Sequence, residues 1–194
     1  MGAANMAVYI GLVHYPIYNR NMEVVTTSLT NYDLHDIART ARTYDMVKYF
    51  IIQPNETQAK LAQDVINYWQ TGYGSQYHED RKEAFSVLQL VDTIEEAMRQ
   101  IQQREGQAPF VVTTDARTYP NTISYPLLRD KLAASDRPCL LLFGTGWGIE
   151  KETMEKFDFI LAPIYGASDY NHLPVRAAAA IILDRLLGET WWNC

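Results

Sequence analysis

The stretch of sequence that decides the fold is PCLLLFGTGWG, residues 138–148. Its first six residues are apolar without interruption, which is typical of a strand at the centre of a parallel sheet that is covered on both faces. Three glycines then follow at alternate positions, Gly144, Gly146 and Gly148. Glycine accepts positive φ angles and lets a ligand approach the backbone closely. The glycine loop therefore either binds a ligand or simply makes a tight turn into the next helix.

Short apolar runs of this kind recur along the chain and alternate with helical patterns. The predicted strands are residues 7–13, 47–52, 85–91, 110–113, 138–143 and 159–161. The predicted helices are residues 34–41 with a cap at 31–33, then 61–69, 93–105, 124–134 and 174–187. This alternation predicts an α/β fold with a mainly parallel sheet of about six strands and helices on both faces. Residues 1–194 are expected to form a single domain, and the polar residues 72–83 are expected to form a solvated loop.

Charge and cysteine content narrow the classes of protein that remain. The chain has 17 Lys and Arg residues against 23 Asp and Glu residues, a formal net charge of -6. This excludes a general polycation but is compatible with a local basic patch that binds RNA. Two cysteines make no disulfide framework, so a cytoplasmic location is expected. The apolar run at residues 7–13 is too short for a signal peptide or a membrane span, and no membrane contact is expected.

Three segments that follow the last three predicted strands are the best candidates for a ligand site. They are residues 113–117, 144–149 and 162–175. Ligands of open α/β sheets bind beyond the carboxyl ends of the strands, so these segments converge if their strands are neighbours. The glycine loop reads G-x-G-x-G and not G-x-G-x-x-G, which argues against a nicotinamide cofactor. The four histidines lack the spacing of metal ligands, so no metal site is predicted.

Arginines on the first predicted helix suggest a face that binds anions. Arg39 stands beside the apolar face and Arg42 lies one turn further on, an arrangement that suits phosphate or carboxylate groups. The alternative is a surface arginine paired with Asp36. A second open choice concerns residues 14–20, which mix aromatic and basic side chains and end at Arg20. They either stack on an unpaired base or form a surface loop held by tyrosines.

Taken together, these segments resemble the SPOUT superfamily of S-adenosylmethionine-dependent RNA methyltransferases. Within it, the chain is similar to a small bacterial family related to the tRNA guanine-N1 methyltransferases. The resemblance covers residues 7–187. Residues 31–42 resemble the first superfamily motif, residues 142–149 the second, which is a glycine loop, and residues 162–176 the third.

The resemblance implies a carboxyl-terminal trefoil knot, a homodimer, S-adenosylmethionine as cofactor, and tRNA or rRNA as substrate. The cofactor residues that it indicates lie in the three post-strand segments: Thr113, Gly144, Thr145, Gly146, Trp147, Gly148, Ile149, Ile164, Asn171, His172, Leu173 and Val175. Arg39 and Asp169 are the candidate catalytic residues, with Asp169 as the base and Arg39 on the acceptor side. Asn31, Arg42 and Arg20 are the candidate RNA contacts.

Alternatives remain for the base and for the protein as a whole. Asp169 alternatively closes a turn through its own backbone. The protein is alternatively a non-catalytic module that binds S-adenosylmethionine or RNA and partners a tRNA-modifying enzyme. Its negative charge and the lack of the glutamate that the loop of the ribose methyltransferases carries favour this module. The tail at residues 190–194 carries two tryptophans, which cover either the protomer's own core or a partner's.

Overall fold

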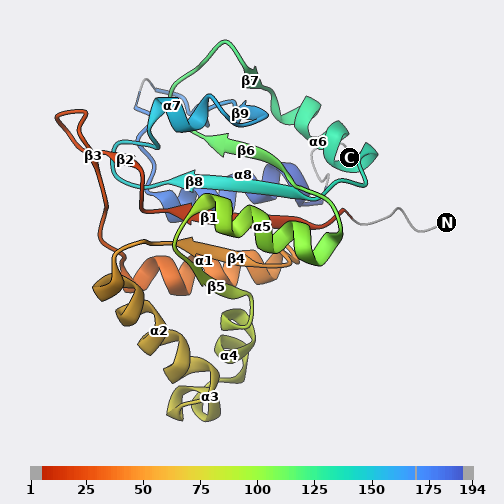
Figure 1. Cartoon of the computed structure of the whole chain (residues 1–194). Helices are drawn as coiled ribbons and strands as arrows, with labels where there is room; N and C mark the ends of the chain where they lie inside the picture. Colours follow the sequence, from red (N-terminus) through yellow and green to blue (C-terminus); the bar gives the residue numbers. More distant parts are fainter. Residues whose placement is uncertain (1–5, 169, 190–194) are drawn as a thin grey trace.

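Seven strands form the main sheet of the computed structural model, which describes residues 6–168 and 170–189 (Figure 1). The order is β5-β4-β1-β8-β6-β9-β7, and every neighbouring pair is parallel. The strands are β1 Val8–Val13, β4 Tyr49–Ile52, β5 Leu88–Val91, β6 Phe110–Thr114, β7 Thr122–Ile123, β8 Cys139–Gly144 and β9 Phe159–Leu161. The predicted parallel sheet is confirmed, but it has one strand more than expected because the two-residue strand β7 pairs with β9 at its edge.

Strand β8 lies at the centre of the sheet, as its apolar sequence predicts. It pairs with β1 on one side and β6 on the other. The β1–β8 register runs from Val8 opposite Cys139 to Val13 opposite Gly144. All six residues of β1 and the first five of β8 are buried, because helices cover both faces of the sheet.

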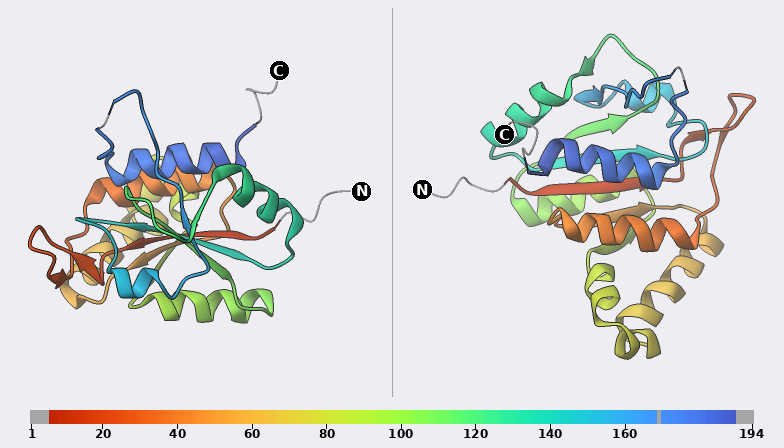
Figure 2. Two further views of the ribbon diagram at one scale, coloured as in Figure 1. Left: turned by 90° about the horizontal axis from the view of Figure 1, so that it is seen from above. Right: turned by 180° about the vertical axis from the view of Figure 1, so that it is seen from behind.

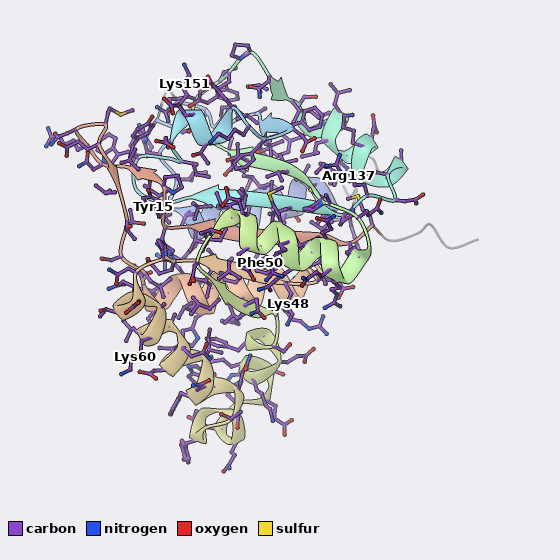
Figure 3. All side chains as sticks on the ribbon, in the orientation of Figure 1. Tyr15, Lys48, Phe50, Lys60, Arg137 and Lys151 are labelled. Carbon is purple, nitrogen blue, oxygen red and sulfur yellow. The ribbon has the colours of Figure 1, made fainter. Side chains whose placement is uncertain are left out.

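Helices α1, α6 and α8 cover one face of the sheet, and α5 and α7 cover the other (Figure 2). The helices are α1 Asn31–Thr43, α2 Glu56–Gln70, α3 Tyr73–Tyr77, α4 Glu79–Phe85, α5 Ile94–Glu105, α6 Tyr125–Ala134, α7 Lys151–Met154 and α8 Val175–Leu187. On the face that α5 covers, Phe50 of β4 belongs to one apolar cluster with Ile94 and Ile101 of that helix (Figure 3). Each face of the sheet therefore has its own apolar core.

Residues 72–83 do not form the predicted solvated loop. They form α3 and most of α4, which project with α2 from the β5 edge of the sheet (Figure 1). Trp69 of α2 anchors them, because the Arg81 guanidinium lies 4.6 Å from its ring centroid and the Phe85 ring 6.2 Å away. Strand β5 begins at Leu88 and not at residue 85 as predicted, because Phe85 is the last residue of α4. Its side chain is fully buried there.

The amino-terminal cap of α1 is Thr30 and not the predicted residues 31–33. The Thr30 hydroxyl accepts a hydrogen bond from the Asp33 amide at 3.3 Å, which satisfies an amide that the first helical turn leaves free. The predicted cap of α5 is confirmed, since the Thr93 hydroxyl accepts from the Glu96 amide at 3.1 Å.

A small hairpin that the sequence did not predict folds against the glycine loop. Its strands are β2 Ile17–Tyr18 and β3 Val24–Val25. The Tyr18 amide donates to the Gly148 carbonyl at 2.9 Å, and the Trp147 amide donates to the Tyr18 carbonyl at 3.1 Å. Backbone hydrogen bonds of Tyr18 therefore hold the glycine loop from outside. Base stacking by residues 14–20 stays a prediction.

Some predictions fall on residues outside the described ranges. Asp169 and the tail at 190–194 lie there, so the candidate base and the two tryptophans have no described position. Within the described ranges, none of the helices is both long enough and apolar enough to cross a membrane. The assignment of residues 1–194 to one domain stays a prediction.

Candidate cofactor and acceptor site

A cavity of about 920 Å³ opens at the carboxyl ends of the central strands. Its volume falls in the range of about 300–1,000 Å³ that is typical of small-molecule sites. Ten of the twelve predicted cofactor residues line it: Gly144, Thr145, Gly146, Trp147, Gly148, Ile164, Asn171, His172, Leu173 and Val175. The convergence follows from the sheet order, because β8, β6 and β9 are neighbours and their following loops meet at one edge.

The other two predicted cofactor residues support the cavity from behind. Thr113 and Ile149 are fully buried and are not among the lining residues. Ile149 forms an isolated bridge with Ile17 of the hairpin. The Thr113 hydroxyl has no hydrogen-bond partner among the described residues, which is uncommon for a buried polar group.

Two glycines of the loop are required by the fold itself. Gly146 has a φ of 53° and Gly148 a φ of 97°, both in the region that L side chains rarely adopt. A Cβ at Gly146 would lie 3.0 Å from Ile17 Cγ2 and 3.3 Å from the Tyr18 carbonyl oxygen. A Cβ at Gly148 would lie 3.0 Å from Asp115 Oδ2. The loop is thus shaped by close packing on both sides as well as by any ligand.

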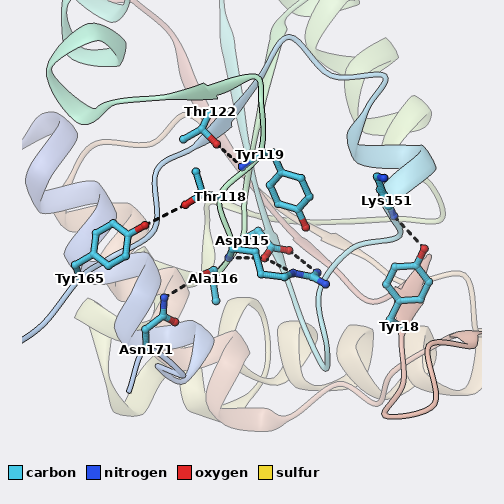
Figure 4. Close-up of polar contacts among 10 residues, drawn as sticks. Tyr18, Asp115, Ala116, Thr118, Tyr119, Thr122, Lys151, Tyr165 and Asn171 are labelled. Carbon is cyan, nitrogen blue, oxygen red and sulfur yellow. Dashed lines mark hydrogen bonds and ion pairs between the residues drawn. The ribbon is translucent and has the colours of Figure 1, made fainter. Parts of the chain in front are cut away.

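The segment between β9 and α8 offers free backbone groups to the cavity. Among the described residues 164–168 and 170–173, the one backbone group with a hydrogen bond to a described residue is the Tyr170 amide, which donates to Ser168 Oγ at 3.4 Å. Side chains tie the segment down instead, since Asn171 Nδ2 donates to the Ala116 carbonyl at 2.8 Å (Figure 4). Free N–H and C=O groups beside apolar walls suit a cofactor with an adenine ring, so the residues present fit S-adenosylmethionine.

An ion pair closes one side of the cavity and was not among the predicted site residues. Arg117 Nε donates to Asp115 Oδ1, and its Nη2 donates to Oδ2, each at 2.9 Å (Figure 4). The hydrogen bond with Asp115 raises the pKa of Arg117 above its usual value. The sequence signal was the position of residues 113–117 directly after a strand, at the same edge as the glycine loop. Asp115 uses both oxygens in this pair, which leaves Arg117 as the fixed positive group at the rim.

The chain from the end of β1 to the first turn of α1 forms a second wall of the cavity, which contacts the glycine loop. Its lining residues, which we call the strap wall, are Met22, Thr27, Ser28, Thr30 and Asp33. The Thr27 hydroxyl lies 2.6 Å from that of Thr145, and the Thr145 hydroxyl donates to the Val13 carbonyl at 2.9 Å. His14 Nδ1 lies 3.0 Å from the Thr27 hydroxyl, and burial lowers the pKa of this histidine to about 4. A neutral histidine therefore braces the junction between the two walls.

Arg39 does not lie in the cavity of its own chain. It is exposed on α1 and is not a lining residue. Its guanidinium has no hydrogen bond or ion pair with the residues that the structure describes. The alternative pairing with Asp36 is wrong, because Asp36 Oδ2 instead accepts from Arg176 Nη1 of α8 at 3.1 Å.

The three candidate RNA contacts also lie outside the cavity. Arg42 is held by acidic neighbours, with Nη1 3.2 Å from Asp45 Oδ1 and Nη2 2.7 Å from Glu83 Oε1. Arg20 is exposed at the tip of the β2–β3 hairpin, and Asn31 is exposed at the first position of α1. None of the described His, Cys, Asp and Glu side chains form a group that could hold a metal ion.

A parallel α/β sheet with a cofactor-sized cavity built from three post-strand loops is typical of enzymes that bind a nucleotide-like cofactor. The chain belongs to the family of S-adenosylmethionine-dependent RNA methyltransferases, whose model matches residues 7–188. The protein is therefore an enzyme of that activity. The comparisons give no support to the non-catalytic module.

Relatives and solved structures agree with this family. An uncharacterized protein of Aquifex aeolicus is 47% identical over 185 residues, which are 95% of this chain and 90% of that protein. A tRNA (guanine-N(1)-)-methyltransferase of Oleidesulfovibrio alaskensis is 42% identical over 182 residues, 94% of this chain but only 42% of that protein. The SpoU methyltransferase AviRb of Streptomyces viridochromogenes, solved with AdoMet, shares the fold with a TM-score of 0.58 at 15% identity. That match covers 94% of this chain and 57% of the AviRb chain.

Proposed function

We propose that this protein transfers a methyl group from S-adenosylmethionine to a nucleotide of tRNA, as a cytoplasmic homodimer. The observation that carries the proposal is the convergence of ten predicted cofactor residues on one cavity at the strand ends. The choice of tRNA over rRNA is supported by relatives named as tRNA methyltransferases. This chain spans 42% and 43% of those two proteins, so the nucleotide in their name is not carried over.

The loop wall is proposed to hold the cofactor. The loop from Gly144 to Gly148 and the backbone groups of Ile164, Asn171, His172 and Leu173 would bind the adenosine, with Leu173 and Val175 as apolar contacts. When bound, S-adenosylmethionine supplies a methyl group on a positively charged sulfur. The protein has to hold an acceptor in line with that methyl and receive the acceptor's proton. Such positioning supplies about 7–11 kcal/mol in well-oriented reactions.

Arg39 is proposed to act on the acceptor bound at the partner's cavity. In its own chain it is exposed, unpaired among the described residues and outside the cavity. Its guanidinium is therefore available to another molecule, whereas Asp45 and Glu83 hold that of Arg42. In a homodimer that joins the α1 and α8 faces, Arg39 would approach the second cavity. Light scattering at micromolar concentration should give twice the chain mass of 22.2 kDa, and a value near 22.2 kDa would contradict the dimer.

The carboxyl-terminal trefoil knot also belongs to this proposal. It is supported by the SPOUT-type fold and by the contacts that tie the segment before α8 to the loop after β6. One is Asn171 to Ala116, and the other joins the Tyr165 and Thr118 hydroxyls at 3.0 Å (Figure 4). A crystal structure in which the segment before α8 passes through the loop after β6 would support the knot, and an unthreaded path would contradict it.

Methyl transfer can be tested with tRNA from a strain that lacks the gene for this protein. The enzyme and labelled S-adenosylmethionine should modify this tRNA, and digestion with mass spectrometry should then identify the methylated nucleoside. Label in rRNA but not in tRNA would contradict the substrate assignment.

A further inference from the structure

We infer that the carboxylate of Asp33 receives the proton of the methyl acceptor, which makes Asp33 a further catalytic residue. The acceptor is then a nucleotide atom that carries N–H or O–H. The inference rests on the proposed function and deepens it. Asp33 lines the cavity on the strap wall and is 7% exposed. It is the one charged group on that wall among the described residues.

The role of Asp33 is argued from the in-line geometry of methyl transfer. The acceptor must attack the methyl from the side opposite the departing sulfur. Because the cofactor is proposed to bind the loop wall, the inference places the acceptor against the strap wall. His172 also lines the cavity, but it belongs to the loop wall, where the cofactor is proposed to bind.

The hydrogen-bond pattern leaves one oxygen of Asp33 available. Oδ2 accepts from the Thr30 hydroxyl at 2.6 Å, which fixes the orientation of the carboxylate. Oδ1 lies 3.8 Å from Arg176 Nε, too far for a hydrogen bond. Asp115 lines the same cavity, but both its oxygens accept from Arg117. Among the lining carboxylates of the described residues, Asp33 is thus the one with an oxygen that accepts no hydrogen bond.

Arg176 of α8 links the two acidic residues of α1. Its Nη1 donates to Asp36 at 3.1 Å, and its guanidinium lies 5.1 Å from the Tyr32 ring centroid. The other titratable groups that face Asp33 are His14 at the end of β1, neutral through burial, and Tyr49 of β4, whose hydroxyl donates to the Asp33 carbonyl at 3.3 Å.

Methyl transfer breaks one bond, forms one bond and moves one proton. The sulfur–methyl bond breaks as the bond from the acceptor nitrogen or oxygen to the methyl forms. The acceptor's proton passes to the Asp33 carboxylate, and the sulfur becomes neutral. A general base of this kind contributes about 10²–10⁴-fold in rate.

The test compares Asp33→Asn with Asp36→Asn, which removes the other carboxylate on Arg176. Asparagine at 33 can still accept from Thr30, so α1 should remain folded, and circular dichroism with calorimetric binding of S-adenosylmethionine should be near wild type. Single-turnover methylation of tRNA from the deletion strain should fall at least 100-fold in Asp33→Asn and stay within threefold in Asp36→Asn.

A binding measurement gives a readout that is independent of turnover. With S-adenosylhomocysteine bound, wild type should prefer unmethylated over methylated tRNA, because only the former can donate to Asp33, and Asp33→Asn should lose this preference. A rate within threefold of wild type in Asp33→Asn, or an equal loss in both variants, would overturn the inference while the proposed function stands. Absence of transfer by the wild type would overturn the proposed function and this inference with it.

Discussion

The hydroxyl of Thr27 lies 2.6 Å from the hydroxyl of Thr145, which joins the strap wall to the glycine loop. The two residues are 118 positions apart in the chain, and both line the cavity. Because His14 also contacts Thr27, the contact connects a buried histidine, the strap and the loop. The width of the cavity at this point is therefore set by a polar contact and not by apolar packing alone.

Thr27→Val should lower both stability and cofactor affinity. Valine keeps the shape but leaves the His14 and Thr145 side chains with one partner fewer, at a cost of about 1–3 kcal/mol. Thermal unfolding and calorimetric titration with S-adenosylmethionine measure the two effects. Thr26→Val is the matched control, since no hydrogen bond of the Thr26 side chain is described. Equal melting temperatures for the two variants would show that the contact does not stabilise the site.

Gly146→Ala should reduce folding stability by about 1–2 kcal/mol, since alanine is strained at positive φ and its Cβ would meet the hairpin at 3.0 Å. From the sequence, a larger residue at 146 is expected to affect only cofactor binding. The structure adds an effect on the fold. Gly166→Ala provides the control, because a Cβ there meets no atom within 4 Å. Chemical denaturation of both variants measures the difference, and the same midpoint for both would contradict the packing argument.

Burial of His14 predicts a loss of stability in acid. Its pKa is lowered from 6.5 to about 4, so the unfolded chain binds a proton more readily than the folded one. The contribution of neutral His14 to the free energy of unfolding is fully present above pH 6.5. It is lost as the pH falls toward 4, by an amount of the order of 3 kcal/mol. His14→Gln removes this pH-dependent contribution and leaves His35 and the carboxylates in place. Urea denaturation at several pH values should give a shallower decline for the variant. Parallel curves would contradict the prediction.

Arg39→Ala should slow methyl transfer about 100-fold and leave cofactor affinity and melting temperature nearly unchanged, because its side chain has no described partner to lose. Arg39→Lys should restore only part of the rate, since lysine lacks the planar guanidinium. Arg99→Ala removes an exposed arginine on α5, across the sheet, and should behave as wild type. A single-turnover rate for Arg39→Ala within threefold of wild type would leave Arg39 without a role in catalysis.

The sequence predicts the centre of the sheet and the loop wall well, because both depend on short continuous stretches of residues. A fully apolar strand such as residues 138–143 has one stable place, and a loop that follows it must emerge at the carboxyl edge. The strap wall was missed because Asp33 and Thr30 reach the cavity only when the chain after β1 folds back over the sheet. The sequence pattern drew attention to Asn31, two positions from the residue that lines the cavity.

The short elements were missed for a different reason. Strands β2, β3 and β7 have two residues each, too few for a periodic pattern. Helix α3 has only five residues, and the sequence of α4, EDRKEAF, is mostly charged. Contacts of Trp69 in α2 with Arg81 and Phe85 hold α4 in place. Tertiary packing, and not local propensity, decides these segments.

Methyl transfer to tRNA tests the central claim most directly. Purified enzyme is incubated with radiolabelled S-adenosylmethionine and tRNA from either the deletion strain or its parent. The account predicts label in tRNA from the deletion strain and little in tRNA from the parent, where the position is already methylated. Absence of label in both samples, with cofactor binding intact by calorimetry, would contradict it.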